Sequence, residues 1–168
     1  MNPAVIAYVG LGGNVGAVAD TLRQATRALD QLPETSVAAV SRLYRTPAWG
    51  LEQQADFVNG VAALQTTLAA PDLLQALLLI ELQFGRDRQS GPRWGPRVLD
   101  LDLLLYAGLT LETPGLRLPH PHLHERAFAL VPLLEIAPDI YIPGQGLARD
   151  ALSRLETVAI EPIGPTEE

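Results

Sequence analysis

The sequence predicts an α+β fold: an antiparallel sheet with helices packed against it, followed by a C-terminal extension of helix and strand. Two observations carry this prediction. Apolar runs typical of strands alternate with stretches of helical spacing in the order β-α-β-β-α-β, which is the split βαβ arrangement. The 168 residues, 48% hydrophobic and 18% charged, suit one domain with a core of its own. We expect the two helices of this motif on one face of the sheet.

The first half of the chain supplies three strands and one helix of this motif. Residues 4–11 are an apolar, β-branched run that ends in glycines, which is typical of a buried strand. Residues 16–32 carry apolar side chains at helical spacing, and a proline stops this helix. Residues 37–44 alternate and predict a second strand. Residues 57–68 predict a third strand, which contains a glycine as a weak point.

The second half of the chain completes the motif and adds the extension. Pro71 favours a helix start, and apolar residues at helical spacing continue this helix to about Gly85. An apolar strand follows at 99–106, after a polar loop. Beyond a proline-rich loop we expect a helix at 125–136, a short strand at 140–142 and a small helix at 147–155. We therefore place one domain at residues 1–158 and a loose tail at 159–168.

The composition excludes several classes of protein. A net charge of −7 argues against a general binder of nucleic acid or anionic membranes. The absence of cysteine excludes disulfides, thiolate metal sites and a cysteine nucleophile. All 12 basic residues are arginine, so a Walker-type phosphate loop and a Schiff-base lysine are excluded as well. No signal-peptide pattern and no apolar run near the ~20 residues of a membrane span occur, and we expect a cytoplasmic protein.

Two aspartates interrupt the Leu-rich strand at 99–106. Successive strand side chains point to opposite faces, so Asp100 and Asp102 project to the same side. Magnesium favours one or two carboxylates together with phosphate oxygens of a substrate. The alternative interpretation is a solvent-exposed edge strand, whose charges prevent pairing with another chain. However, aspartate is disfavoured inside strands. The pair therefore predicts a magnesium site that holds one ion or two bridged ions.

Four arginines lie just before these aspartates, within 12 residues that contain two glycines. They are Arg86, Arg88, Arg93 and Arg97. A solvated basic loop is the alternative interpretation. Beside a carboxylate pair, however, the planar guanidinium fork suits phosphate, and phosphoryl transfer needs charge neutralisation and alignment more than covalent chemistry. We therefore expect a loop that closes over a bound nucleotide.

Two other motifs suggest different chemistry, and both are weaker. The glycine-rich turn at residues 10–16 places Val15 where the third glycine of G-x-G-x-x-G belongs, so a dinucleotide site is disfavoured. All three histidines lie in one short segment, which makes a zinc or iron site conceivable. Because His124 is expected to begin or cap a helix, the three rings do not share a face. One histidine that contacts phosphate is the favoured interpretation.

An aromatic residue and an amide share one face of the strand at 57–68. Phe57 and Asn59 are two residues apart, so both side chains point to the same side. The alternative is a core phenylalanine with a strand-end asparagine. As a functional pair they could stack on and read a flat heterocycle. The turn that contains Thr46, Pro47 and Trp49 ends the preceding strand and could lie beside them.

Together these motifs resemble the 6-hydroxymethyl-7,8-dihydropterin pyrophosphokinase family of folate biosynthesis. The resemblance covers residues 7–139, nearly the whole domain. Its most specific word is Arg-Trp-Gly-Pro-Arg-x-Leu-Asp-Leu-Asp at residues 93–102. The other matching words are Gly12-Gly13-Asn14, Tyr44-Arg45-Thr46-Pro47, Asp56-Phe57-Val58-Asn59, Leu118-Pro119-His120, Arg126-Ala127-Phe128 and Glu135-Ile136-Ala137-Pro138.

The resemblance implies a ferredoxin-like fold, a monomer, and an ATP-dependent diphosphotransferase that uses two Mg²⁺ ions. It implies transfer of the β,γ-pyrophosphoryl unit of ATP to the hydroxymethyl oxygen of the pterin, with release of AMP. Asp100 and Asp102 would bind both metals, and Arg86, Arg88 and Arg97 would act in catalysis. The residues implied in ATP binding are Glu81, Arg88, Arg93, Trp94, Arg97, Leu103 through its backbone, His120 and Arg126.

The resemblance also implies a pterin site, in which Phe57 and Phe128 stack on the two faces of the ring and Asn59 reads its polar edge. The other residues implied there are Thr46, Pro47, Trp49 and Asp100. Phe57 departs from the tyrosine that is frequent in the family, which keeps the stacking and loses a hydroxyl. The alternative function is a non-catalytic nucleotide- or pterin-binding module of the same fold. A His-metal hydrolase is more remote.

Overall fold

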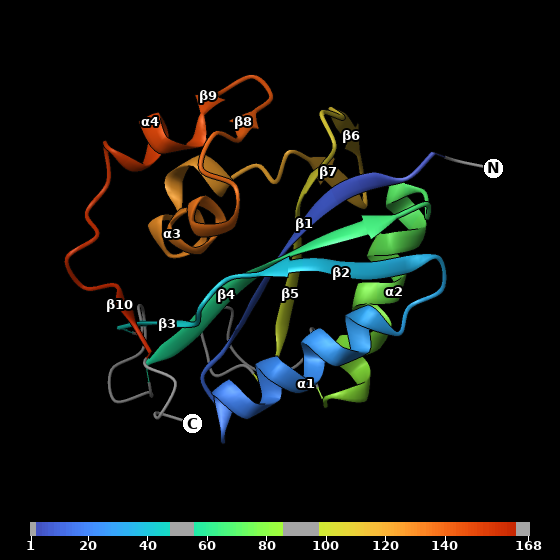
Figure 1. The fold of residues 1–168 in the computed structure, drawn as a ribbon, viewed down its shortest axis with the longest axis horizontal. Helices are drawn as coiled ribbons and strands as arrows, with labels where there is room; N and C mark the ends of the chain where they lie inside the picture. Colours follow the sequence, from blue (N-terminus) through green and yellow to red (C-terminus); the bar gives the residue numbers. More distant parts are fainter. Residues whose placement is uncertain (1–2, 48–55, 86–97, 164–168) are drawn as a thin grey trace.

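A computed structural model describes residues 3–47, 56–85 and 98–163 of the chain. Within this part, six strands form one antiparallel sheet in the order β10-β3-β4-β1-β5, with β2 also paired to β4 (Figure 1). The expected α+β, ferredoxin-like architecture is confirmed. The strands are β1 (Val5–Gly13), β2 (Thr35–Val40), β3 (Tyr44–Thr46), β4 (Phe57–Thr66), β5 (Asp100–Tyr106) and β10 (Glu161–Pro162).

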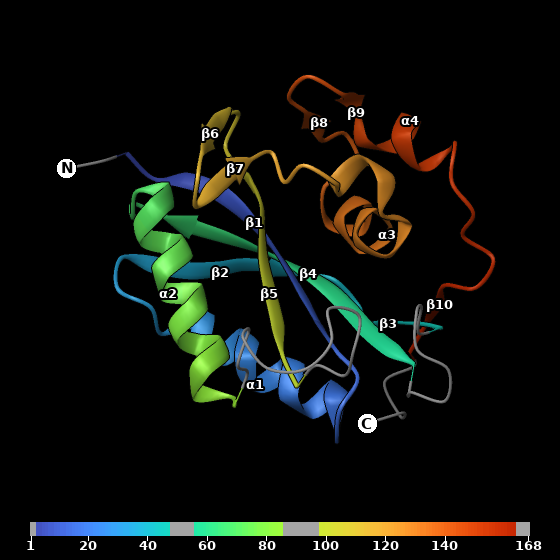
Figure 2. The same ribbon diagram turned by 180° about the vertical axis from the view of Figure 1, so that it is seen from behind.

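Two helices cover one face of the sheet, α1 (Val18–Asp30) and α2 (Ala70–Gln83) (Figure 2). Both form because apolar residues recur at helical spacing, and α2 begins with a proline in its first turn as expected. Their apolar stripes meet the sheet side chains that point the same way. The fully buried members of this core include Leu22, Leu29, Leu73, Leu77, Ala7, Val9 and Leu64.

The two helices of the motif therefore share one face as expected, and the C-terminal extension covers the opposite face. The extension comprises the 3₁₀ turn η1 (Leu123–Glu125), α3 (Ala127–Ile136), the hairpin of β8 (Tyr141–Ile142) and β9 (Gly146–Leu147), and α4 (Ala148–Leu152). Leu123, Leu130 and Leu133 are fully buried in this second core. The sheet needs two coverings because Val61 and Leu104 present an apolar surface on this side as well.

The predicted strand at 37–44 is wrong as a single element. It divides into β2 and β3, which pair with successive parts of β4. Val40 lies opposite Ala62 and Tyr44 lies opposite Asn59, so four steps on one side match three on the other. One extra residue therefore forms a bulge between the two strands.

Two further expectations need correction. The proline-rich loop contains a hairpin of β6 (Leu111–Thr113) and β7 (Leu116–Leu118), joined by Pro114-Gly115. The tail is not loose up to Ile163, because β10 pairs with β3 and the Ile163 side chain is buried. No helix in the part of the chain that the structure describes is long and apolar enough to cross a membrane.

Candidate active site

The two aspartates lie on β5, the edge strand of the sheet beside β1. Their side chains are half-buried and share one face, as the alternation of the strand requires. Asp100 lies opposite Gly12 and Asp102 lies opposite Gly10 in the β1–β5 ladder. Each carboxylate therefore has a neighbour on β1 with no side chain.

On this face of the sheet, β1 presents glycine backbone between β4 and β5. Asn59 on β4 lies opposite Gly12 from the other side, so Gly12 separates Asn59 from Asp100. A Cβ atom on Gly12 would lie 2.5 Å from Asn59 Oδ1, closer than real contacts allow. The three strands thus present an amide, a bare backbone and a carboxylate side by side on one face.

The other expected pterin residues of β3 and β4 lie beside Asn59. Phe57 is half-buried and shares the face of Asn59. Thr46 pairs with Phe57 across the β3–β4 ladder, and Asn59 Nδ2 donates a long hydrogen bond of 3.5 Å to Thr46 Oγ1. Pro47 follows at the end of β3 and is exposed. The structure therefore brings these four predicted residues together.

The first turn of α3 lies on the same face of the sheet as the aspartates. Arg126 is the N-cap residue, and its guanidinium carbon lies 5.8 Å from the centre of the Phe128 ring. Phe128 is half-buried and packs against the core beneath α3. The helix thus carries a cation and an aromatic ring toward the end of the sheet where the site residues gather.

His120 is held as a neutral imidazole beside these charges. Its backbone N–H donates to the Leu104 carbonyl at 2.9 Å, which fastens it to β5. Burial, and then the positive charge of Arg126, lower the pKa of His120 to about 4, although Asp100 acts in the opposite direction. His120 Nδ1 accepts the backbone N–H of His122 at 3.2 Å. Since a neutral imidazole carries one proton, that proton lies on Nε2, which can donate to a ligand oxygen.

Glu81 takes part in the fold as well as in the expected nucleotide site. Its side chain, at the end of α2, is almost fully buried, and Oε2 accepts the Leu101 N–H at 2.7 Å. A carboxylate so deeply buried requires strong partners. This hydrogen bond joins α2 to β5 at Leu101, the residue between the two aspartates.

A cavity of about 280 Å³ follows the outer edge of β5, between α2 and the β6–β7 hairpin. Asp102, Leu103 and His120 line it, as expected for a nucleotide site. It is also lined by four residues that no sequence motif indicated: Leu74, Leu78, Leu116 and Arg117. The Pro114-Gly115 pair is a turn signal that could have revealed the hairpin, and thus Arg117.

A larger hollow of about 410 Å³ lies on the other side of the hairpin. It shares Arg117, His120 and Pro121 with the first cavity but is lined by neither aspartate, so its larger size does not make it the active site. The histidines do not assemble a metal site, since no group of three histidine or acidic residues in the described ranges could hold an ion.

Several predicted site residues lie outside the described residues. These are Trp49 of the pterin site and Arg86, Arg88, Arg93, Trp94 and Arg97 of the arginine-rich loop. The described segments on either side of that loop end at Gly85, after α2, and resume at Val98, before β5. Both ends thus adjoin elements that line the cavity.

Comparison with known proteins matches residues 8–138 to the family model for 7,8-dihydro-6-hydroxymethylpterin-pyrophosphokinase. The chain belongs to this family. A Pseudomonas aeruginosa protein named 2-amino-4-hydroxy-6-hydroxymethyldihydropteridine pyrophosphokinase is 49% identical over 136 residues, 81% of this chain and 83% of the relative. A Methylorubrum extorquens protein of the same name is 45% identical over 157 residues, 94% of this chain and 98% of the relative.

Solved structures agree with this family assignment at the level of the fold. The chain is similar to a Plasmodium falciparum HPPK-DHPS crystal structure with pteroate, with a TM-score of 0.71 and 14% sequence identity. The similarity covers 92% of this chain but 43% of the longer one. At this identity the likeness supports the ferredoxin-like pyrophosphokinase fold alone.

Proposed function

We propose that this pyrophosphokinase transfers the β,γ-pyrophosphoryl group of ATP to the hydroxymethyl oxygen of 6-hydroxymethyl-7,8-dihydropterin and releases AMP. Membership of the family supports this proposal. The observation that carries it is the position of Asp100 and Asp102. They lie on β5, between the cavity at its outer edge and the glycine backbone of β1 that separates them from Asn59.

The donor set fits magnesium. Two carboxylates from one strand face supply hard oxygen ligands, and substrate phosphates can complete the octahedral shell. Gly10 and Gly12, which lie opposite the two aspartates on β1, place no side chain of their own against the carboxylates. We propose that Asp100 and Asp102 hold two ions, which would neutralise charge on the transferring phosphates when bound.

The remaining described residues bind and orient the two substrates in this proposal. The apolar side chains of α2 and β7 would enclose the nucleoside base, while Nε2 of the neutral His120 donates to an oxygen of the nucleotide. Arg126 would add positive charge near the phosphates. Phe57 and Phe128 would stack on the pterin.

Asn59 would read the polar edge of the pterin. It lies two strands from Asp100, a span of about 10 Å that suits a flat bicyclic ring. This arrangement would bring the hydroxymethyl group toward the carboxylates and the phosphates. The roles of Glu81, Leu103, Thr46, Pro47, Trp49 and the loop arginines Arg86, Arg88, Arg93 and Arg97, with Trp94, stay predictions, as do the monomeric state and the cytoplasmic location.

The test is product analysis with fresh reduced pterin. The protein is incubated with Mg-ATP with and without 6-hydroxymethyl-7,8-dihydropterin, and the nucleotides are separated. AMP whose formation depends on the pterin is the expected result. ADP as the sole nucleotide product contradicts the proposal. Binding of both substrates without turnover indicates the non-catalytic module.

A further inference from the structure

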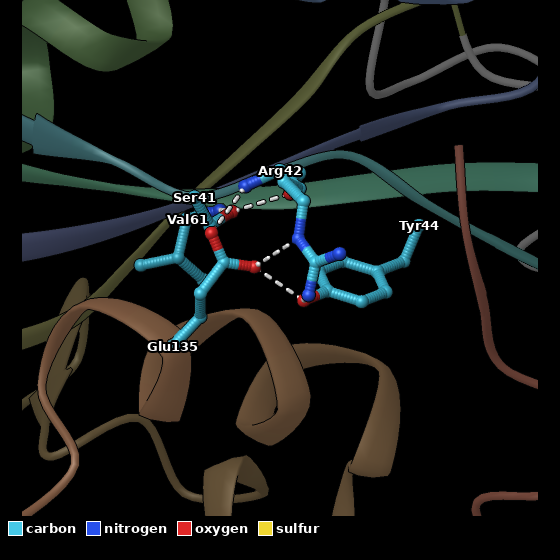
Figure 3. A network of polar contacts seen from close by, with 5 residues as sticks. All are labelled: Ser41, Arg42, Tyr44, Val61 and Glu135. Carbon is cyan, nitrogen blue, oxygen red and sulfur yellow. Dashed lines mark hydrogen bonds and ion pairs between the residues drawn. The ribbon is translucent and has the colours of Figure 1, made fainter. Parts of the chain in front are cut away.

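One carboxylate of α3 contacts the junction between β2 and β3. Glu135 Oε2 accepts the Arg42 backbone N–H at 2.8 Å, and Oε1 accepts Arg42 Nε at 3.2 Å. The Tyr44 hydroxyl also donates to Oε1 (Figure 3). We call Arg42, Tyr44 and Glu135 the Glu135 clamp. Tyr44 and Glu135 are the first residues of two of the matching motifs, and neither residue has a role in the proposed reaction.

The bulge explains why the junction needs an external acceptor. Ser41 Oγ accepts the Val61 N–H at 2.9 Å and donates to the Arg42 carbonyl at 2.7 Å. At this point of the β2–β4 pair, the Ser41 side chain therefore takes the place of a backbone acceptor for the Val61 N–H. On the other side, the Arg42 N–H is turned toward α3, where Glu135 accepts it (Figure 3).

The energetics point to Tyr44 and Glu135 as the important pair. Tyr44 is 5% exposed, so its hydroxyl needs a partner within the protein. The Arg42 side chain is 63% exposed, and exposed ion pairs contribute little. Burial would raise the pKa of Glu135, yet hydrogen bonds from Tyr44 and Arg42 outweigh it and lower that pKa. Glu135 thus stays an ionised acceptor.

The stability of α3 by itself does not account for Glu135. The residue lies in the last turn of the helix, where a negative charge opposes the helix dipole, and no basic residue lies in that turn. Its carboxylate is oriented toward the sheet and away from the helix axis (Figure 3). The contact with β3 is therefore the physical reason for an acid at this position.

The clamp joins the two elements that carry the walls of the pterin site. Phe128 and Glu135 are seven residues apart on α3, which is two turns, so both lie on one face of the helix about 10 Å apart. On the sheet side, Tyr44 pairs with Asn59 and Thr46 pairs with Phe57. A shift of α3 against β3 would change the spacing between Phe128 and Phe57.

We propose that Glu135 is a positioning residue for the pterin site, which acts through Tyr44 and the Arg42 backbone to set the distance between α3 and the β3–β4 pair. This inference rests on the proposed function. It assigns the clamp to pterin affinity and leaves the nucleotide cavity, at the edge of β5, independent of it.

The experiment measures dissociation constants by calorimetry for Glu135→Gln and Tyr44→Phe. Pterin is titrated in the presence of a non-hydrolysable Mg-ATP analogue, and the analogue is titrated alone. We expect a 5- to 50-fold weaker pterin affinity in both variants. The affinity for the analogue stays within twofold, and the KM for pterin rises while the KM for ATP does not.

Two control variants separate positioning from general loss of stability. Tyr106→Phe removes the hydroxyl of a β5 tyrosine, which donates to the Leu68 carbonyl in the segment between β4 and α2. We expect it to lower the melting temperature about as much as Tyr44→Phe and to leave pterin affinity unchanged. Arg42→Ala removes the guanidinium and its 3.4 Å contact with the Tyr44 hydroxyl. It keeps the backbone N–H bond and the Tyr44 bond to Glu135, so its pterin affinity is expected within twofold of wild type.

The possible outcomes separate a failure of the positioning role from a failure of the proposed function. The positioning role is overturned when Glu135→Gln and Tyr44→Phe lose thermal stability with unchanged pterin affinity, or when Tyr106→Phe weakens pterin binding equally. A wild-type protein that binds no pterin refutes the proposed function itself, and the inference with it. Weaker pterin binding in Glu135→Gln and Tyr44→Phe, with wild-type affinity in both controls, supports the proposal.

Discussion

Replacing Gly12 with alanine should damage the pterin site without unfolding the sheet. The new Cβ would lie 2.5 Å from Asn59 Oδ1. An ordinary non-bonded contact needs about 3.5 Å, so the amide must move by about 1 Å. The terminal amide is the flexible end of a side chain, and it is the group that yields, because the β1 backbone is paired with strands on both sides.

The size of the effect follows from the hydrogen bonds that Asn59 makes. A displaced amide leaves polar groups of the bound heterocycle unpaired, at a cost of about 1–3 kcal/mol. This range corresponds to a roughly 5- to 150-fold loss of kcat/KM for the pterin. The free energy of unfolding should stay within about 1 kcal/mol of wild type, because alanine reduces the freedom of the unfolded chain relative to glycine.

The assay compares two variants on the same strand face. Pterin affinity and kcat/KM are measured for Gly12→Ala and Gly10→Ala, with urea unfolding of both. A Cβ on Gly10 would meet side-chain carbons of Leu104 at 3.5–3.7 Å, which is ordinary contact, so its pterin affinity should be near wild type. Wild-type pterin affinity in a folded Gly12→Ala protein, or an equal loss in both variants, would refute the reasoning.

Three other outcomes are expected. Asp102→Ala should reduce AMP formation below about 1% of wild type with an unchanged circular dichroism spectrum, because a metal ligand is lost, and wild-type rates would contradict the metal assignment. Glu81→Ala should lower the free energy of unfolding in urea by about 1–3 kcal/mol, since the Leu101 N–H loses its buried acceptor. Glu81→Gln, which keeps an acceptor, should lose less, and equal losses would argue against that bond. The third outcome concerns pH: because folded His120 takes up its proton near pH 4 and the unfolded chain near 6.5, the unfolded state binds more protons between these values, and stability falls as pH falls. His120→Asn should show a shallower loss of stability from pH 6.5 to 4, and identical slopes would refute the assignment.

The local sequence pattern was sufficient to predict those elements whose conformation depends mainly on their own residues. Alternation along a strand places Asp100 and Asp102 on one face, and the structure agrees. Helical spacing and Pro71 predict α2 within two residues of its observed bounds. The resemblance to the pyrophosphokinase family rests on short words of the same kind, and the family match bears it out.

Partners that are distant in the sequence decided the features that the pattern missed. The strand at 37–44 breaks because Arg42 finds its acceptor in Glu135, 93 positions later. The β10 strand contains Glu161 and Pro162, which have little strand propensity, and it forms because β3 offers it a ladder at the edge of the sheet.

The sequence by itself determined which groups this protein has for its chemistry: two carboxylates on one strand face, arginines in place of lysine, and aromatic residues with an amide to hold a flat ring. Only the tertiary structure decided how these groups are used. Gly12 becomes a point of close approach because the Asn59 amide lies against its backbone, and His120 becomes a neutral donor because burial and Arg126 oppose its charge. Space and local electrostatics depend on neighbours from other parts of the chain, which periodicity does not specify.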